Sequence, residues 1–407
     1  MQKKYLSVGA LALTASLTAS ILFFTHSTWA ADSVIQLASA TTTPSPASTA
    51  PTLSTPTSTT PASTGTTAPT TAPADTSTLN LSLEDALKSV ETGNSSLKLL
   101  DSKILIYDKQ NQQALARHDA NIPVVDEASK KDRALNYQRT QWTLDNAKHD
   151  RATQLKDLQV AITNEYEGIL TLQQQAENLK KQHSNLDTVI EQVNLQINLG
   201  LKIPSDLYAY KAQISKLEAG QKAITNSINS AMNTLKQDLG IDLNREVVLT
   251  SKLNAYTKFD ETDLENKIAK AVKNNYDIQK YTQDIAITQT EYDIDFYYDD
   301  IYADPIQLSV EDKKATLANL PVTKEVSLRA AYNSLKTLEN TIEADKLTVE
   351  ADQINIDIKQ KNIDVGTSST LEMIPLQTTL LNDQYTLQQD INAYMAAAAN
   401  FQNSLEP

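Results

Sequence analysis

The sequence has no cysteine and only 8 glycines in 407 residues. The absence of cysteine excludes disulfide bonds and a lipid-modified N-terminal cysteine. The scarcity of glycine argues against a large catalytic α/β domain, which needs many tight turns. The sequence also lacks a Gly-rich phosphate loop and a nucleophile elbow, and His118 and His149 have no partner at zinc-ligand spacing. We therefore expect no enzyme activity, no cofactor and no metal site.

Basic residues are outnumbered by acidic ones, 36 against 50, which gives a formal net charge of −14. Residues 1–78 hold few charged side chains, so this acidic balance belongs to the remainder of the chain. A surface of net negative charge argues against binding nucleic acid and against attraction to anionic lipid headgroups.

The first 78 residues contain two segments that differ from the rest. Residues 1–30 have the pattern of a signal peptide, with Lys3 and Lys4 before an apolar stretch and small residues ahead of Ala31. An uncleaved membrane anchor is the alternative, since the apolar stretch approaches membrane-spanning length. Residues 31–78 are rich in Thr, Pro and Ser and predict a disordered tether, because they cannot bury enough apolar surface to fold. The chain is therefore expected to be exported.

The remainder of the chain shows an internal repeat. Residues 160–240 align with residues 326–406 without a gap, and Gly200 falls on Gly366. A shorter match upstream places residues 83–104 on residues 264–285. The two repeats are predicted to be residues 79–254 and 255–407. A repeat of this length indicates a duplicated structural unit.

Each repeat has a heptad pattern of apolar residues, the signature of a coiled coil. The first series is Leu155, Ile162, Ile169, Ala176, His183, Ile190 and Ile197, and its counterpart is Leu328, Leu335, Ile342, Val349, Ile356 and Ile363. New series begin after Gly200 and Gly366, which are predicted to end the preceding helices in the left-handed conformation. The expected fold is all-α, built from two long antiparallel helical hairpins with little or no β-structure.

Three motifs resemble those of the TolC family of outer-membrane efflux proteins. The opening segment at residues 81–94 is similar to the start of these proteins, and the turns at residues 200–207 and 366–373 resemble the paired turn motif of the family. The resemblance covers about residues 79–406. It implies a homotrimer whose hairpins wall an α-helical tunnel, an inner-membrane transporter and an adaptor protein as partners, and a place in the outer membrane.

The sequence departs from this family in two segments, which in the family hold the inserted strands of the membrane barrel. Residues 111–154 show no ten-residue alternation of apolar and polar side chains, and residues 292–325 alternate only as far as Tyr298. We expect both segments to be helical, with loops at residues 121–129 and 299–321, and the second long helix to run from about Asp132 to Leu199.

The family closes the narrow end of its tunnel with polar contacts at the hairpin turns. The corresponding candidate residues are Gly200, Lys202, Asp206, Gly366, Ser368 and Glu372. An arginine of the family is replaced by Ser368, and Lys202 is the only base expected near the two acids. Asp206 and Glu372 each follow a turn by a few residues, where a carboxylate stabilises a helix start, and a ring of them at a tunnel mouth would favour cations.

Two functions remain open at this point. The first is a passive duct subunit of an efflux or secretion system. The second is an exported coiled-coil scaffold or adaptor of the cell envelope that has lost the membrane barrel. The intact repeat and turns favour the duct, whereas the missing alternation favours the scaffold. Membrane association is left open, and location would be the outer membrane for the duct or the wall and extracellular face for the scaffold.

Overall fold

The computed structural model describes residues 77–120, 123–298 and 300–406, all of which belong to one compact unit. The predicted signal peptide and nearly all of the predicted tether lie outside the described residues. The elements are β1 (Leu79–Leu81), α1 (Leu83–Gly93), α2 (Ser95–Asp119), α3 (Glu127–Lys131), a π-helical turn (Asp132–Asn136), α4 (Tyr137–Asn198), α5 (Asp206–Leu239), β2 (Val247–Leu249), α6 (Leu264–Lys273), α7 (Tyr276–Tyr298), α8 (Asp300–Asp364), a 3₁₀ turn (Thr370–Glu372) and α9 (Met373–Leu405). The predicted all-α class is confirmed.

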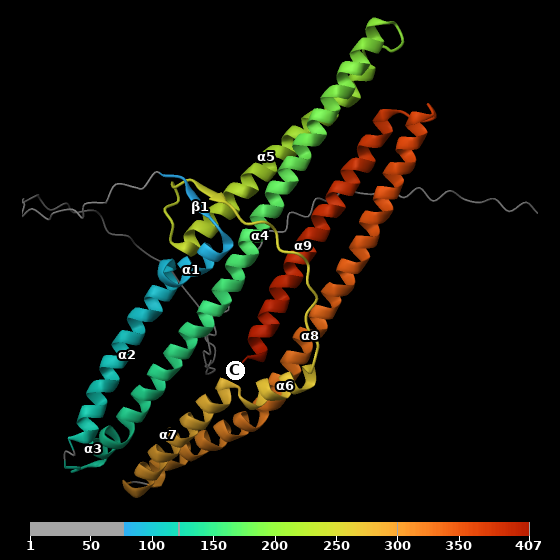
Figure 1. Cartoon of the computed structure of the whole chain (residues 1–407). Helices are drawn as coiled ribbons and strands as arrows, with labels where there is room; N and C mark the ends of the chain where they lie inside the picture. Colours follow the sequence, from blue (N-terminus) through green and yellow to red (C-terminus); the bar gives the residue numbers. More distant parts are fainter. Residues whose placement is uncertain (1–76, 121–122, 299, 407) are drawn as a thin grey trace, which may run out of the picture. The chain divides into compact units, whose positions relative to one another are not determined.

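Hairpin 1 consists of α4 and α5, which pack against each other as antiparallel helices (Figure 1). The 62 residues of α4 make a helix of roughly 90 Å at 1.5 Å per residue. Towards the turn, buried Leu186 and Val193 of α4 meet buried Tyr210 and Leu217 of α5. Leu186 and Val193 are seven residues apart, as are Tyr210 and Leu217, so the buried face repeats at heptad spacing. The predicted series through Ile190 and Ile197 lies beside it and is only partly buried.

Hairpin 2 consists of α8 and α9, and its core repeats this arrangement. Ile342, Leu335 and Leu328 of α8 pack against Tyr394 and Phe401 of α9 in one cluster. The shorter helices α2 and α7 pack along the first parts of α4 and α8, respectively. Figure 1 shows the turns of both hairpins at one end of this unit and the α2–α3 and α7–α8 connections at the other.

A two-stranded parallel sheet joins the start of the described chain to the connection between the two halves. Leu79 pairs with Val247 and Leu81 with Leu249. The buried hydroxyl of Tyr166 donates to the carbonyl of Leu81 at 2.8 Å. The same oxygen accepts from the backbone N–H groups of residues 250 and 251 at 3.0 and 2.9 Å. Tyr166 therefore ties the sheet to the middle of α4.

The loop expected at residues 299–321 is wrong. After residue 299, α8 begins at Asp300 and continues through Pro305 and Pro321. Each proline removes one helical hydrogen bond. Packing against α7 offsets this loss, since Val310 is buried and Lys313 pairs with Asp284 of α7 at 2.8 Å. Tertiary contacts therefore override the two local helix breakers.

The predictions that residues 111–154 and 292–325 are largely helical fit the described residues. Residues 111–119 and 127–154 are helical, and so are residues 292–298 and 300–325. The first expected loop is shorter than predicted, because Asp126 caps α3 at Glu127 through a capping box with Ser129. Within the described part of the chain, no helix combines the length and the apolar character needed to cross a membrane.

Candidate functional site at the hairpin turns

The turn of hairpin 1 follows the pattern of a Schellman motif. Gly200 has a φ of +72°, a conformation that costs glycine least. Its N–H donates to the carbonyl of Ile197 at 2.9 Å, and the N–H of Leu201 donates to the carbonyl of Gln196 at 2.8 Å. These two bonds satisfy carbonyls at the end of α4 that the helix itself leaves free.

Lys202 and Asp206 follow this turn. Asp206 is the first residue of α5, and its Oδ2 accepts from the N–H of Ile203 at 3.4 Å. Its carboxylate therefore lies at the positive end of the helix dipole. The Ser205 side chain makes no capping hydrogen bond, so a serine cap at this helix is not formed. Lys202 is half-exposed.

The turn of hairpin 2 repeats the backbone geometry with different side chains. Gly366 has a φ of +78°, and its N–H donates to the carbonyl of Ile363 at 2.9 Å. The N–H of Ser368 donates to the carbonyl of Asn362 at 3.2 Å. Glu372 forms a capping box with Ser369, accepting from its N–H at 3.2 Å and from its hydroxyl at 3.1 Å.

Glu372 also pairs with a base that sequence reasoning missed. Lys359 Nζ of α8 lies 3.0 Å from Glu372 Oε2. The hydrogen bond with Lys359, followed by the bonds from Ser369, lowers the pKa of Glu372 below its ordinary value. Lys202 is thus not the only nearby base. Lys359 lies seven residues before Gly366 and Glu372 six residues after it, so the symmetry of an antiparallel hairpin could have revealed the pair.

The structure keeps the two turns chemically separate. Lys202 and Asp206 belong to one turn, and Ser368 and Glu372 belong to the other. Among the described residues, no hydrogen bond or ion pair joins the two sets. The six candidate residues therefore form two similar sites at one end of the unit (Figure 1). They are not one constellation within a single chain.

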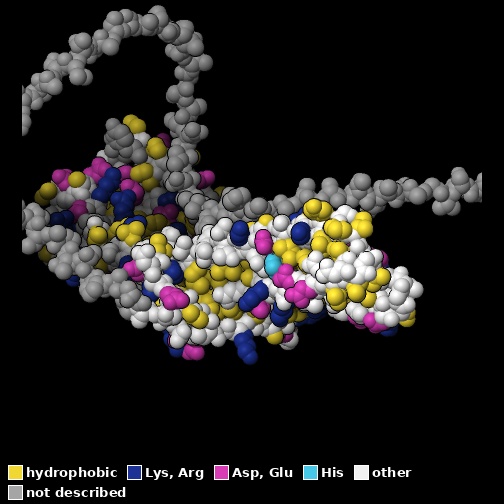
Figure 2. Space-filling view, turned by 90° about the horizontal axis from the view of Figure 1, so that it is seen from above, with side chains coloured by type: hydrophobic (Ala, Val, Ile, Leu, Met, Phe, Trp, Pro, Cys, Tyr) yellow, Lys and Arg dark blue, Asp and Glu magenta, His cyan; other side chains and the backbone are white. Residues whose placement is uncertain are grey.

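Both turns expose apolar side chains. Leu201 is 72% exposed and so is Val365, and Leu199 and Ile203 are exposed as well. The view from above in Figure 2 shows hydrophobic side chains gathered in patches between charged ones. Large apolar side chains that gather on a surface commonly mark places where another molecule binds.

Four aspartates lie together in hairpin 2. Asp345 and Asp352 of α8 and Asp383 and Asp390 of α9, together called the aspartate stripe, are all half-buried. Burial, followed by hydrogen bonding to Asp352, raises the pKa of Asp383 to about 6. Burial, followed by hydrogen bonding to Asp345, raises the pKa of Asp390 to about 6.

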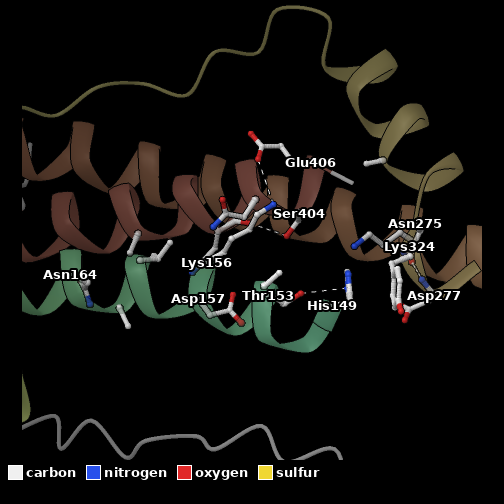
Figure 3. A pocket seen from close by; sticks show the side chains of 18 residues that line it. His149, Thr153, Lys156, Asp157, Asn164, Asn275, Asp277, Lys324, Ser404 and Glu406 are labelled. Carbon is white, nitrogen blue, oxygen red and sulfur yellow. Dashed lines mark hydrogen bonds and ion pairs between the residues drawn. The ribbon is translucent and has the colours of Figure 1, made fainter. Parts of the chain in front are cut away.

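A cavity of about 660 Å³ with a mixed polar and apolar lining lies elsewhere, between α4, the junction of α6 and α7, α8 and the end of α9 (Figure 3). The ring of His149 stacks on Tyr276 with centroids 3.6 Å apart, and burial lowers the pKa of His149. Lys156 Nζ lies 3.7 Å from Glu406 Oε2. Among the described residues, no group of three or more His, Asp or Glu could hold a metal ion.

Comparison with known proteins identifies the fold. No family model matches the chain, and neither does any curated protein. Solved structures do match it. CusC, described as forming a transmembrane channel, aligns at a TM-score of 0.62 and 10% identity over 79% of this chain and 91% of its own. The outer-membrane protein VceC of Vibrio cholerae aligns at a TM-score of 0.59 and 14% identity, over 79% of this chain and 94% of its own. The outer-membrane channel CmeC of Campylobacter jejuni aligns at a TM-score of 0.63 and 10% identity, over 79% of this chain and 85% of its own.

These likenesses confirm the TolC-type fold that the sequence motifs predicted. At identities of 9–14%, they concern the fold alone. The alignments span most of each matched structure, so the shared fold is that of nearly the whole similar protein. The three named structures are channels or outer-membrane proteins, and no enzyme is among them.

Proposed function

We propose that this chain is a subunit of a passive duct in the cell envelope, serving efflux or secretion. The observation that carries the proposal is the match of about 79% of the chain to solved outer-membrane channels. Three copies, the number implied by the family resemblance, would place six hairpins around a tunnel. The residues 1–30 predicted as an export signal would deliver the chain to the envelope.

In this proposal the hairpin turns line the tunnel mouth. Asp206 and Glu372 then contribute six carboxylates to it, which favours cations over anions. Lys359 reduces the effective charge of Glu372, because the ion pair occupies one of its oxygens. Asp206 has no ion pair among the described residues, so it is the stronger contributor to the field at the mouth.

The exposed apolar side chains of the turns support docking of a partner at the same end. Leu201 and Val365 would meet apolar side chains of an adaptor or of an inner-membrane transporter. Apolar side chains left in water forgo the free energy that burial would provide. A partner docked on the turns would remove them from water and recover it.

The first test is the mass and shape of the chain from residue 31 onward, measured in solution and in detergent. We expect a trimer, and electron micrographs of its end views should show a central hole. A monodisperse monomer at tens of micromolar would overturn the duct proposal and leave the envelope scaffold as the function to pursue.

The second test is ion conduction through planar bilayers. Hexaamminecobalt(III), a trivalent cation, should block the wild-type current. The double variant Asp206→Asn/Glu372→Gln should weaken this block by about tenfold or more, since neutral amides keep the shape and remove the charge. Glu218→Gln/Glu350→Gln replaces two exposed acids farther along α5 and α8; this charge-matched control should leave the block nearly unchanged. Equal block in all three proteins would show that the turns are not the mouth.

A further inference from the structure

Hairpin 1 has a face that is occupied by hairpin 2 within the same chain. Leu186 and Leu217 belong to an apolar cluster that includes Ile374 of α9. Farther along the same contact, Gln182 donates to the carbonyl of Gln377 at 3.5 Å. Farther still, Thr171 accepts from the side-chain amide of Asn392 at 3.0 Å. One face of α4 therefore docks along α9.

The corresponding face of hairpin 2 has no neighbour within the described chain. The sequence repeat has an offset of 166 residues, so Thr171 corresponds to Thr337 and Gln182 to Thr348. Thr337, Thr341, Thr348 and Asn355 are all exposed on α8. A surface that is covered in hairpin 1 is thus open in hairpin 2.

The aspartate stripe borders this open face. The same offset places Asp345 on Leu179, Asp352 on Leu186, Asp383 on Leu217 and Asp390 on Ile224. Four positions that are apolar in hairpin 1 are carboxylic acids in hairpin 2. One carboxyl oxygen of Asp345 and one of Asp352 are buried and accept no hydrogen bond from a described residue. Four half-buried acids with two unpartnered oxygens among them favour a cationic partner, because negative charge that is buried without compensation is costly.

The matching cations lie on α5 of the same sequence. Gln377 and Asn392 of α9 bond to α4, and the offset places them on Lys211 and Asn226. Gln388, one turn before Asn392 and hydrogen-bonded to it, falls on Lys222. All three residues of α5 are exposed. Neither lysine makes an ion pair or hydrogen bond with another described residue. The face of α5 that corresponds to the docking face of α9 is therefore open and basic.

If the α4–α9 contact within the chain is repeated between α8 of one copy and α5 of the next, the register of the two helices follows. Because Gln182 meets Gln377, Thr348 of one copy would meet Lys211 of the next, and Lys211 would lie between Asp345 and Asp352. Lys222 lies three helical turns away along α5, opposite Thr341, which is one turn from Asp345. Each lysine is thus brought within reach of the stripe.

We infer that the open α8 face and its aspartate stripe bind the Lys211 and Lys222 face of α5 in a second copy of this chain. The contact is head-to-tail, because it joins two different surfaces. It supplies the interface that the duct proposal requires, and closure into a ring rests on that proposal. The partner is specified by charge complementarity, which also sets the register of the two helices.

Charge reversal tests the interface. Asp345→Lys/Asp352→Lys and Lys211→Asp/Lys222→Asp should each weaken self-association, measured by sedimentation velocity, by about tenfold or more. In a mixture of the two reversed proteins, both contacts between unlike proteins pair opposite charges, so association should recover to within about threefold of wild type. Glu350→Lys/Asp357→Lys and Lys180→Asp/Lys216→Asp are matched controls of equal charge change. Glu350, Asp357 and Lys216 each lie five residues from a tested position, about 140° around the helix. Unchanged association of the reversed variants, or failure of the mixture to associate, would overturn the inference.

Disulfide trapping provides a second measurement that tolerates reduced stability. The chain has no cysteine, so Thr348→Cys/Lys211→Cys introduces the only thiols. We expect mild oxidation to produce covalent dimers and larger species, whereas Thr348→Cys/Lys216→Cys should stay monomeric on a denaturing gel. An oligomer without this cross-link refutes the interface and leaves the duct possible. A cross-linked oligomer without a central hole refutes the duct and leaves the interface in place.

Discussion

Glu165 and Asp238 place two carboxyl groups together inside hairpin 1. Glu165 interrupts the apolar series that runs from Leu158 to Val193 on α4. Burial, followed by the charge of Asp238 and a hydrogen bond to it, raises the pKa of Glu165 from 4.5 to about 8. One of its oxygens is buried and has no hydrogen-bond partner among the described residues. We expect the replacement Glu165→Gln to stabilise the protein at alkaline pH.

The sign follows from proton binding. Below about pH 4, Glu165 is protonated in both the folded and the unfolded chain, so it makes no pH-dependent difference. Between its ordinary pKa and about 8, the folded chain holds a proton that the unfolded chain has lost, so the free energy of unfolding falls as pH rises. Above about 8 the carboxyl is ionised in both states, and the whole penalty is present.

The magnitude has an upper bound from the shift itself. At about 1.4 kcal/mol per pKa unit, a rise from 4.5 to about 8 corresponds to roughly 5 kcal/mol. Glu165 is half-buried rather than enclosed, and solvent screening reduces the penalty. We therefore expect Glu165→Gln to raise the free energy of unfolding by about 2 kcal/mol near pH 9 and by almost nothing near pH 4. The side-chain amide of glutamine can also donate to Asp238.

Urea unfolding followed by circular dichroism at a series of pH values measures the effect. The difference between variant and wild type should grow with pH and reach a plateau above about 8. Glu191→Gln replaces an exposed glutamate of the same helix and should give a small difference at every pH. A variant curve that runs parallel to wild type from acid to alkaline pH would refute the assignment of this penalty to Glu165.

Three further predictions concern named contacts. Gly200→Ala should lower the free energy of unfolding by about 1 kcal/mol, because Gly200 has a φ of +72°. Gly168→Ala, in an open helical position of α4, should raise it by up to about 1 kcal/mol. Equal effects of the two substitutions in urea unfolding would contradict the turn geometry. Tyr166→Phe should cost about 2 kcal/mol in the same assay, because two backbone N–H groups lose their acceptor, and a neutral result would count against the sheet anchor. NMR titration should find the pKa of Glu372 below its ordinary value, so its stabilising contribution is lost as pH falls through that lowered value; Lys359→Met should raise the pKa, and no change would disprove the ion pair.

The sequence alone was sufficient for features that depend on local backbone geometry and on periodicity. Heptad spacing selects the packing faces of α4 and α8 whatever their partner, and a glycine that ends a helix needs no distant contact to adopt a positive φ. Gly200 and Gly366 were therefore predictable, and so was the all-α hairpin fold. The capping box of Glu372 was predictable for the same reason, because its partner Ser369 lies three residues away.

Features that depend on contacts between distant segments required the tertiary structure. Pro305 and Pro321 indicate a loop locally, and only packing against α7 shows that a helix can pass through both. Lys359 meets Glu372 only once the hairpin closes. The aspartates of hairpin 2 look like solvated acids along a helix, and their half-burial follows from the face on which α8 and α9 meet. Local propensity reports the cost of a residue in its own segment, whereas burial and charge pairing are set by the neighbours that the folded chain brings together.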